Sequence, residues 1–499
     1  MALITRIDDC LSERNGHLFC EECDTVDLVE QFGSPLFVMS EDQIRRNVRR
    51  FQDAFQQGWP HGPVKVLPAA KANWLAAVQH ILADEGCGCD IYSTGELTIA
   101  LDAGFDPELI SVNGVPKDRD HIYRCIQAGV RITIDSVEEV DVIENAADEL
   151  GLAAKVRLRL KPAMPGALEH SDFVAEGLVP TDVATMAYKG GLAFGDIMAI
   201  GPRILRMKNV ELVGLHQHYG RHRASTRYWK ELMRAFAEEA GRVCKALDGF
   251  HPREIDIGGG FAVPRDPFNA ATDYTEPFQL AMLHGLSRCL SLLGPERRYK
   301  VMSRIIDGIV KKPNRTPAPT IEDYAEVATR TLREELPKNG INVEGLMLQI
   351  EPGRGVFGNA GIHLTTVRNI KRMMRPIRWT VVIVDTTEFW FTGGRFEHNL
   401  HHYVFANKVD APMVDKADIA GSSCFGDRLI PMVPIPEVEV GDILAMLDTG
   451  AYQEVSMSNF NAMLRPATVL VTGDRAVTIR RSETEEDLLS RDIMPEHLK

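Results

Sequence analysis

The middle of the chain repeats one pattern eight times, in which a short β-branched or apolar run ends in a polar or glycine-rich cluster before a helical stretch. Between several of these runs lie amphipathic segments, such as residues 94–105 and 136–151, with apolar spacing near ~3.6. Alternating strands and helices imply a parallel sheet, and eight units over roughly 300 residues predict a closed (β/α)8 barrel. The predicted strands are residues 64–68, 89–93, 109–114, 130–135, 154–162, 210–218, 254–260 and 345–353.

Chemically useful residues stand at the C-terminal ends of these runs, where a barrel of this kind carries its site. A lysine such as Lys71, taken alone, is most simply the first solvated residue after a strand. The convergence of many such ends on one face argues against that simple interpretation. In chain order the ends carry Lys71, Asp90 with Ser93, Asn113, Asp135, Arg159, His218, Gly258–Gly260, and Glu351 with Arg354.

Charge and composition exclude several classes of function. The formal net charge of −14 disfavours binding to a phosphate backbone, and the basic run 368–378 is expected to be a solvated strand or loop. We see no signal peptide and no apolar stretch long enough for a membrane span. The nine scattered cysteines fit a reducing compartment, so we expect a cytoplasmic protein without nucleic-acid or membrane partners. Cys20 and Cys23 lack a second ligand pair, and we expect no metal.

The glycine run Gly258–Gly260 would let backbone N–H groups approach a phosphate, although a tight turn explains such a run equally well. Arg354 would add a cation. A lysine beside a phosphate site suggests a Schiff base from Lys71 to pyridoxal 5′-phosphate. Glu351 would then keep the pyridine nitrogen protonated, and His218 would stack on the ring or be an ordinary core histidine.

Ordered motifs strengthen this interpretation: "AAKANW", "CDIYSTGE", "GLHQHYG", "DIGGGF", "EPGRG", "GSSCFGD", "DTGAYQ" and "SNF". Together they resemble the fold-type III pyridoxal-phosphate decarboxylases, the group of the diaminopimelate, ornithine and arginine decarboxylases, and most of all the diaminopimelate branch. The resemblance implies a barrel domain at 43–365 with an insertion at about 264–318. It also implies a β-rich, barrel-like domain from 1–42 and 366–499, which includes the N-terminal strand.

The resemblance also implies residue roles. Lys71 holds the cofactor aldehyde, Glu351 stabilises the quinonoid through the pyridine nitrogen, and His218 stacks on the ring. Cys424, inserted from a partner subunit, protonates the carbon after carbon dioxide leaves, so we expect a homodimer with shared sites. The implied cofactor-binding residues are Lys71, Asp90, Arg159, His218, Gly258, Gly259, Gly260, Glu351, Gly353, Arg354 and Tyr452.

The sequence departs from the family where the substrate would bind. Phe425 follows the cysteine where the family has an acid, with Asp427 nearby in a segment one residue short. The Arg-Pro that helps hold a distal carboxylate is missing, and Arg395 is the candidate replacement. His401 and His402 replace a Tyr-Asp pair of the ornithine enzymes.

Two further departures concern the cofactor phosphate and the insertion. Arg221 replaces a phosphate-binding serine. The insertion contains a predicted helix at 278–294, which would cover the site or be a surface elaboration.

These observations predict decarboxylation of an amino acid, and the departures favour a non-standard amino acid of specialised metabolism. The first alternative is a diaminopimelate decarboxylase of lysine biosynthesis. A racemase of the same fold is another, although Glu351 and Cys424 speak against it. A non-catalytic regulatory homologue is the alternative from a different class, although such proteins tend to lose the lysine, glycines or cysteine retained here.

Overall fold

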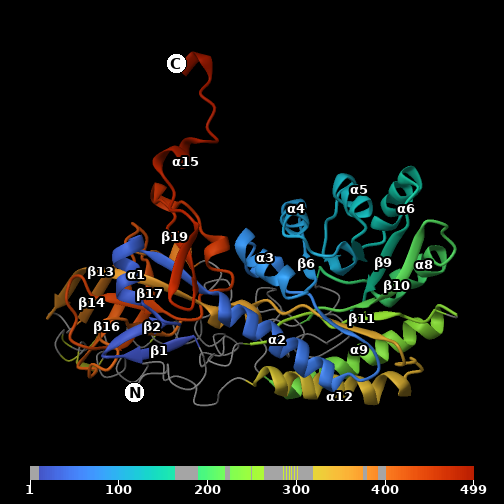
Figure 1. The fold of residues 1–499 in the computed structure, drawn as a ribbon, viewed down its shortest axis with the longest axis horizontal. Coiled ribbons are helices and arrows are strands. Elements are labelled where there is room, and N and C mark those ends of the chain that lie inside the picture. Colours follow the sequence, from blue (N-terminus) through green and yellow to red (C-terminus); the bar gives the residue numbers. More distant parts are fainter. Residues whose placement is uncertain are drawn as a thin grey trace. The chain divides into compact units, whose positions relative to one another are not determined.

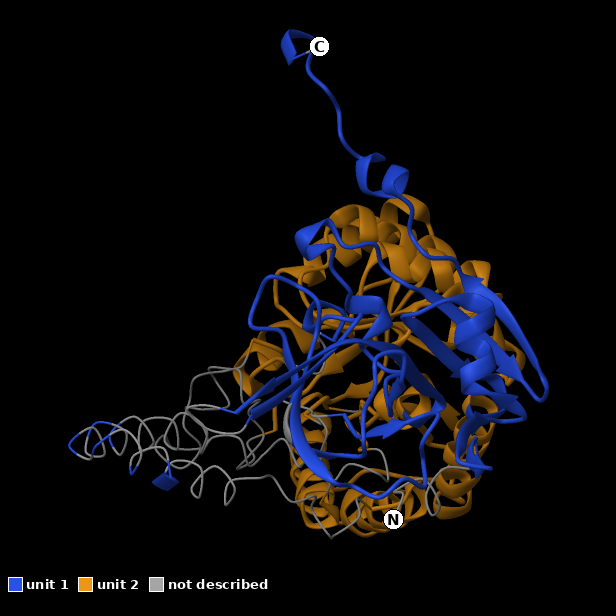
Figure 2. Ribbon diagram, turned by 90° about the vertical axis from the view of Figure 1, so that its left-hand side faces the viewer, with its two compact units in different colours: residues 1–43, 265–317, 359–499 blue, residues 44–264, 318–358 orange. Residues whose placement is uncertain are grey.

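The computed structural model describes residues 10–162, 189–219, 225–248, 250–262, 319–374, 379–391 and 401–498, with isolated positions between 285 and 301. Arg221, Arg395 and nearly all of the predicted insertion lie outside these residues, so the expectations about them stay predictions. The chain divides into two compact units (Figure 2). Unit 1 is residues 1–43, 265–317 and 359–499, and unit 2 is residues 44–264 and 318–358.

Unit 2 is the predicted (β/α)8 barrel, and all eight predicted strands are present (Figure 1). The parallel sheet has the order β5-β12-β11-β10-β9-β8-β7-β6. Its first and last strands also approach each other, because Ala69 and Asp90 form a parallel bridge and Gly88 donates its N–H to the Val66 carbonyl at 2.9 Å. The strands are β5 (Val64–Val66), β6 (Cys89–Ile91), β7 (Ile110–Val112), β8 (Arg131–Ile134), β9 (Ala154–Arg159), β10 (Val210–His216), β11 (Glu254–Asp256) and β12 (Met347–Ile350).

Helices follow the strands, and local sequence fixes where they begin and end. The side chain of Ser93 accepts the Glu96 N–H at the start of one helix, and Gly129 ends another in the left-handed conformation, as caps of these types do. The helices are α2 (Glu41–Gly58), α3 (Ala76–Asp84), α4 (Thr94–Asp102), α5 (Arg119–Ala128), α6 (Glu139–Leu150), α8 (Phe194–Ile204), α9 (Thr226–Ala246), α12 (Ile321–Lys338) and α13 (Arg354–Phe357).

An aromatic cluster fixes helices against the strand that carries the glycine run. Phe261, just after that run, stacks on Trp229 of α9 with ring centroids 4.4 Å apart, and it also contacts Phe51 of α2 and Tyr324 of α12. All four rings are buried. Because close-packed cores resist displacement, this cluster holds the backbone after β11 in place.

Unit 1 is the predicted β-rich module, a curled mixed sheet that recruits a strand from the N-terminal part of the chain. Strand β4 (Leu36–Ser40) pairs antiparallel with β13 and parallel with β19. The sheet order is β17-β16-β14-β13-β4-β19-β20, with β18 pairing β13 and β15. Its other strands are β13 (Gly361–Met373), β14 (Trp379–Val384), β15 (Tyr403–Phe405), β16 (Asp415–Ala420), β17 (Arg428–Ile435), β18 (Ile443–Met446), β19 (Ala467–Thr472) and β20 (Arg475–Arg480).

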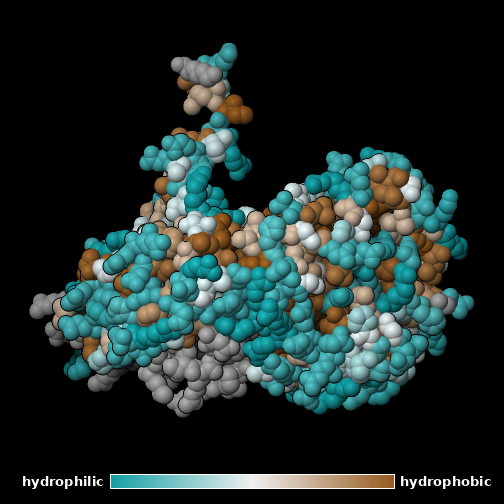
Figure 3. Space-filling model, viewed as in Figure 1, coloured by the Kyte–Doolittle hydropathy of each residue, from teal (hydrophilic) through white to brown (hydrophobic). Residues whose placement is uncertain are grey.

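The remaining elements of unit 1 lie near the two ends of the chain. A small antiparallel sheet of β1 (Leu11–Arg14), β2 (His17–Cys20) and β3 (Cys23–Asp24) precedes α1 (Thr25–Phe32). The C-terminal segment after α15 (Glu485–Leu489) exposes apolar side chains, which stand out in the hydropathy view of Figure 3. No helix in the described ranges is long and apolar enough to cross a bilayer.

Candidate active site

The interior of the barrel is polar, because charged side chains two residues apart on the same strand both point inward. Arg157 and Arg159 lie on β9, and both are buried. Arg157 donates to Asp256 of β11 at 2.8 Å and to Gln349 of β12 at 2.6 Å. Since each buried charge here has a partner, the layer is a stable floor beneath the C-terminal ends of the strands.

Above this floor, one continuous chain of contacts joins the residues predicted from the strand ends. It begins at Lys71, whose Nζ lies 3.6 Å from Oδ2 of Asp90. Asn113, just after β7, donates from Nδ2 to Oδ1 of Asp90 at 2.6 Å and to Oε1 of Glu351 at 2.6 Å. The structure thus brings together Asp90 of β6 and residues that follow β5, β7 and β12.

The chain of contacts continues from Glu351 to the glycine run. Oε2 of Glu351 lies 3.5 Å from Nδ1 of His218, and that nitrogen accepts the Gly259 N–H at 3.2 Å. Oε1 of Glu351 lies 3.2 Å from Nε2 of His216. The predicted lysine, histidine, acid and glycine run therefore occupy one end of the barrel.

Gly258 and Gly259 must be glycines, because the backbones of neighbouring loops lie too close to leave room for a Cβ atom. A Cβ at Gly259 would lie 2.0 Å from the Glu351 carbonyl oxygen, and one at Gly258 would lie 2.7 Å from the Gln217 carbonyl oxygen. Gly258 and Gly260 also have positive φ, which disfavours other residues. At this tight junction of the loops after β10, β11 and β12, the Gly258 N–H donates to Oδ1 of Asp256 at 2.9 Å, and the Gly259 N–H donates to His218 as described above.

Arg159 is fixed beside this site. Its Nη1 donates to Oδ2 of Asp135 at 2.6 Å, and its Nη2 donates to the His218 carbonyl at 3.4 Å. Burial alone would raise the pKa of Asp135, but the Arg159 guanidinium and the Gly191 N–H hold it below its usual range. Gly353 caps the four-residue helix α13, which starts at the buried Arg354.

The pKa values of the two buried acids in this set of contacts, Asp90 and Glu351, are shifted in opposite directions. Burial, together with the charge of Glu351, raises the pKa of Asp90 to about 7, although Lys71 opposes the shift. Burial would also raise the pKa of Glu351, but His216 and His218 hold it well below its usual range. Glu351 is therefore ionised at neutral pH, while Asp90 is close to its midpoint.

From the sequence, no role was predicted for Asn113, and His216, Asp256 and Arg157 were not recognised as site residues. The signal for His216 was present, because "HQH" places His216 and His218 two residues apart and so on one face of the strand. Ligand atoms of His216, Asp256 and Glu351 lie within 4.8 Å of one another, a spacing that could hold a metal. The two carboxylates of this cluster also accept hydrogen bonds within the protein, Asp256 from Arg157 and Glu351 from Asn113.

The other predicted site residues belong to unit 1 and are described within it. Cys424 is exposed, and its N–H donates to Oδ1 of Asn461 at 2.9 Å. Tyr452 has φ of 68°, an uncommon conformation for a residue other than glycine. His401 and His402 are both buried, and Nδ1 of His401 donates to the Leu447 carbonyl at 2.9 Å.

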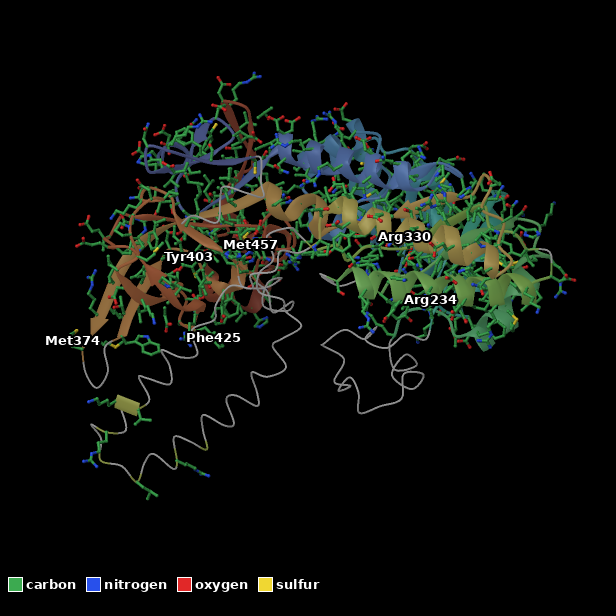
Figure 4. The ribbon with its side chains drawn as sticks, turned by 90° about the horizontal axis from the view of Figure 1, so that it is seen from below. Arg234, Arg330, Met374, Tyr403, Phe425 and Met457 are labelled. Atoms are coloured by element: carbon green, nitrogen blue, oxygen red, sulfur yellow. The ribbon has the colours of Figure 1, made fainter. Side chains whose placement is uncertain are left out.

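Phe425 and Asp427 differ sharply in solvent exposure, although they are only two residues apart. Phe425, labelled in Figure 4, is 51% exposed. Its ring lies edge-on to that of Phe389, with ring centroids 5.7 Å apart. Asp427 is buried, and its carboxylate accepts the Glu388 N–H at 2.6 Å and the Ser423 N–H at 2.7 Å. Both oxygens of Asp427 are thus engaged in holding the loop that carries Cys424.

The donor set at the barrel end fits pyridoxal 5′-phosphate. Lys71 offers an amine on a side chain that is 49% exposed, Glu351 offers an ionised acid, and the close-packed glycine run lies beside them. An amine, an acid and a glycine-rich loop on one barrel face are what this cofactor requires. Fold and site together define the class of pyridoxal-phosphate barrel enzymes.

Comparisons with known proteins point to the same class of enzyme. Residues 41–282 match the family described as "Pyridoxal-dependent decarboxylase, pyridoxal binding domain". The chain is 29% identical to the diaminopimelate decarboxylase of Methanothermobacter thermautotrophicus over 488 residues, covering 97% of each chain. The crystal structure of diaminopimelate decarboxylase from M. jannaschii in co-complex with L-lysine superposes with a TM-score of 0.80 at 27% identity, covering 98% of this chain and 99% of that one.

The chain therefore belongs to the fold-type III pyridoxal-phosphate decarboxylases, in the diaminopimelate decarboxylase branch. Its cofactor is pyridoxal 5′-phosphate, and it is an amino-acid decarboxylase.

Proposed function

We propose that the protein decarboxylates diaminopimelate to lysine. The observation that supports this most is the similarity to enzymes of that name along nearly the whole chain. This proposal replaces the non-standard amino acid favoured by the sequence departures, which the comparisons do not support. Those departures fall on a few separate positions, whereas the similarity extends over nearly the whole chain.

In this proposal Lys71 would hold the cofactor through its amine, at the aldehyde that the substrate amine also needs to reach. The bound cofactor supplies an electron sink for the pair of electrons left when carbon dioxide departs. Glu351, ionised at neutral pH, would hold a proton on the pyridine nitrogen. Gly258–Gly260, Arg354 and Tyr452 would hold the phosphate, and His218 would orient the ring.

Cys424 of a partner subunit completes the reaction by giving a proton to the α-carbon, so that one carboxylate is replaced by one hydrogen. This role requires a homodimer with shared sites, which we propose because the resemblance implies it. We further propose that unit 2 is the cofactor domain and unit 1 the β-rich domain, and that the enzyme works in the cytoplasm, in keeping with its scattered cysteines.

A second candidate substrate class is an amino acid with a bulky or apolar distal group. Phe425 favours it, because an exposed phenylalanine packed on Phe389 offers no charge to a distal ammonium. An apolar distal group would instead gain contact with the ring.

The test is a substrate panel in heavy water with the holoenzyme and a Lys71→Ala control. The panel contains the diaminopimelate stereoisomers, L-lysine, L-ornithine, L-arginine and side-chain-acylated amino acids, and mass spectrometry follows the products. We expect singly deuterated lysine from diaminopimelate. A preference for an acylated amino acid would replace our proposal with the second candidate, and deuterium exchange without loss of carbon dioxide would indicate a racemase.

A further inference from the structure

We infer that His216 is a positioning residue for Glu351: its Nε2–H donates to Oε1 of the carboxylate and so sets how strongly Glu351 holds a proton on the cofactor. The inference rests on cofactor binding and not on the identity of the substrate.

The His216 ring presents one nitrogen to a carboxylate, and its other nitrogen is buried without a partner in the described part of the chain. His216 is the last residue of β10 and is 1% exposed, and its Nε2 lies 3.2 Å from Oε1 of Glu351. On the other side of the ring, the buried Nδ1 has no hydrogen-bond partner among the described residues. A proton on Nδ1 would therefore be buried unpaired, whereas a proton on Nε2 is paired with a carboxylate.

The surrounding charges agree with a neutral donor. His216 is faced by Glu351 just after β12, by Arg157 and Arg159 on β9, and by Asp256 on β11. Burial lowers the pKa of His216 to about 4, although Glu351 opposes this. The ring therefore stays neutral near pH 7, with its single proton on the nitrogen that faces Glu351.

The donor matters because Glu351 is fully enclosed. A buried carboxylate keeps its charge only where donors replace water. Asn113 and His216 both contact Oε1, while His218 faces Oε2 and also accepts from Gly259. Removing the His216 donor leaves Asn113 to support that oxygen and makes Glu351 a stronger base.

The test compares His216→Phe, which keeps a ring but loses the donor, with His216→Gln, which restores an N–H at similar reach. His363→Phe is the matched control, because His363 is a buried histidine of unit 1 whose Nε2 contacts Oγ1 of Thr386 at 3.0 Å. Each holoenzyme is loaded with pyridoxal phosphate labelled with ¹⁵N in the pyridine ring. The ¹⁵N chemical shift is then followed against pH without substrate.

We expect His216→Phe to raise the proton affinity of the Glu351–pyridine pair about ten- to a hundredfold, the size expected for a hydrogen bond to a charged group. The acid limb of the titration then moves up by about one to two pH units. His216→Gln should restore much of the shift, and His363→Phe should titrate like the wild type. An unshifted titration in His216→Phe would overturn the inference.

A second measurement decides the matter if His216→Phe does not fold or does not load. In wild-type holoenzyme labelled with ¹⁵N-histidine, the His216 ring should be neutral at pH 7 with its proton on Nε2. A proton on Nδ1, or on both nitrogens, contradicts the inference. Because neither measurement uses a substrate, both outcomes are independent of whether diaminopimelate is decarboxylated.

Discussion

Asn113 donates from its side-chain nitrogen to Oε1 of Glu351 across 2.6 Å. The same nitrogen lies 2.6 Å from Oδ1 of Asp90, so one amide separates two buried carboxylates. Like charges at such close range repel strongly in a site without water. The Asn113 amide thus reduces the repulsion between Glu351, which is ionised, and Asp90, which lies next to Lys71.

Replacing Asn113 by leucine should damage the site more than the fold. The side chain keeps its size but leaves both carboxylates without this donor, which should cost about 1–3 kcal/mol of stability. We expect kcat/KM to fall by about tenfold to a hundredfold, together with the affinity for pyridoxal phosphate. Steady-state kinetics and cofactor titration measure these quantities.

Thr329→Val is the control for this prediction. Thr329 is buried in α12 of the same unit, and its Oγ1 donates to the Ala325 carbonyl at 2.6 Å. Its replacement should lower stability by a similar amount and leave cofactor affinity close to wild type. Equal losses of cofactor affinity in both variants would mean that Asn113 has only a structural role.

Gly259→Ala should disrupt the phosphate side of the site. The new Cβ would lie 2.0 Å from a backbone oxygen of Glu351, so the loops after β11 and β12 must separate. We expect a loss of about 1–3 kcal/mol in stability and at least a tenfold weaker cofactor affinity. Denaturant melts and fluorescence titration with pyridoxal phosphate check both.

A glycine with open space provides the comparison. Gly195 lies in α8, and a Cβ there would meet nothing within 4 Å. Gly195→Ala should leave cofactor affinity unchanged and stabilise the helix by about 0.5–1 kcal/mol. If Gly259→Ala behaves like Gly195→Ala, the glycine run is not a close-packed cofactor loop.

The barrel could be predicted from sequence because each strand is an apolar run followed by a polar end. The predicted strands extend too far at their C-terminal ends. For example, residues 254–260 were predicted as one strand, but the observed strand is only Glu254–Asp256. A run such as "IDIGGG" gives no local sign of where pairing stops. The last part of each predicted strand is therefore the loop that carries the site.

The polar interior could not be predicted from local pattern. In a strand such as "KVRLR", alternating charges normally indicate a face toward water. In a closed barrel that face points inward, so Arg157 must pair with Asp256, which is about 100 residues away in sequence. The partner of an inward charge is set by the order of strands around the barrel, which local periodicity does not encode.

Asp90 should make the stability of the cofactor-free protein depend on pH. Its native pKa of about 7 exceeds its ordinary value of 3.8, so between these pH values the native state binds a proton that the unfolded chain lacks. Stability should therefore fall as pH rises from about 4 to about 7, by at most about 4 kcal/mol. Asp90→Asn should remove this slope and be relatively more stable above pH 7.

Urea denaturation of the cofactor-free protein from pH 5 to 8 measures the slope. Asp102→Asn serves as the control, because Asp102 is exposed on α4 and should leave the wild-type slope in place. Parallel stability curves for wild type and Asp90→Asn would show that Asp90 is already ionised at pH 5.

Mixing two inactive variants should restore activity if sites are shared between subunits. Lys71→Ala removes the cofactor amine from one barrel, and Cys424→Ala removes an exposed thiol of unit 1. Each homodimer should lack decarboxylase activity. After co-refolding at equal amounts, about half of the dimers are mixed, and each mixed dimer has one site with both groups intact, so roughly a quarter of wild-type activity should return. If the mixture stays inactive while sedimentation shows mixed dimers, Cys424 acts within its own chain. An active Cys424→Ala homodimer would instead mean that Cys424 has no part in the reaction.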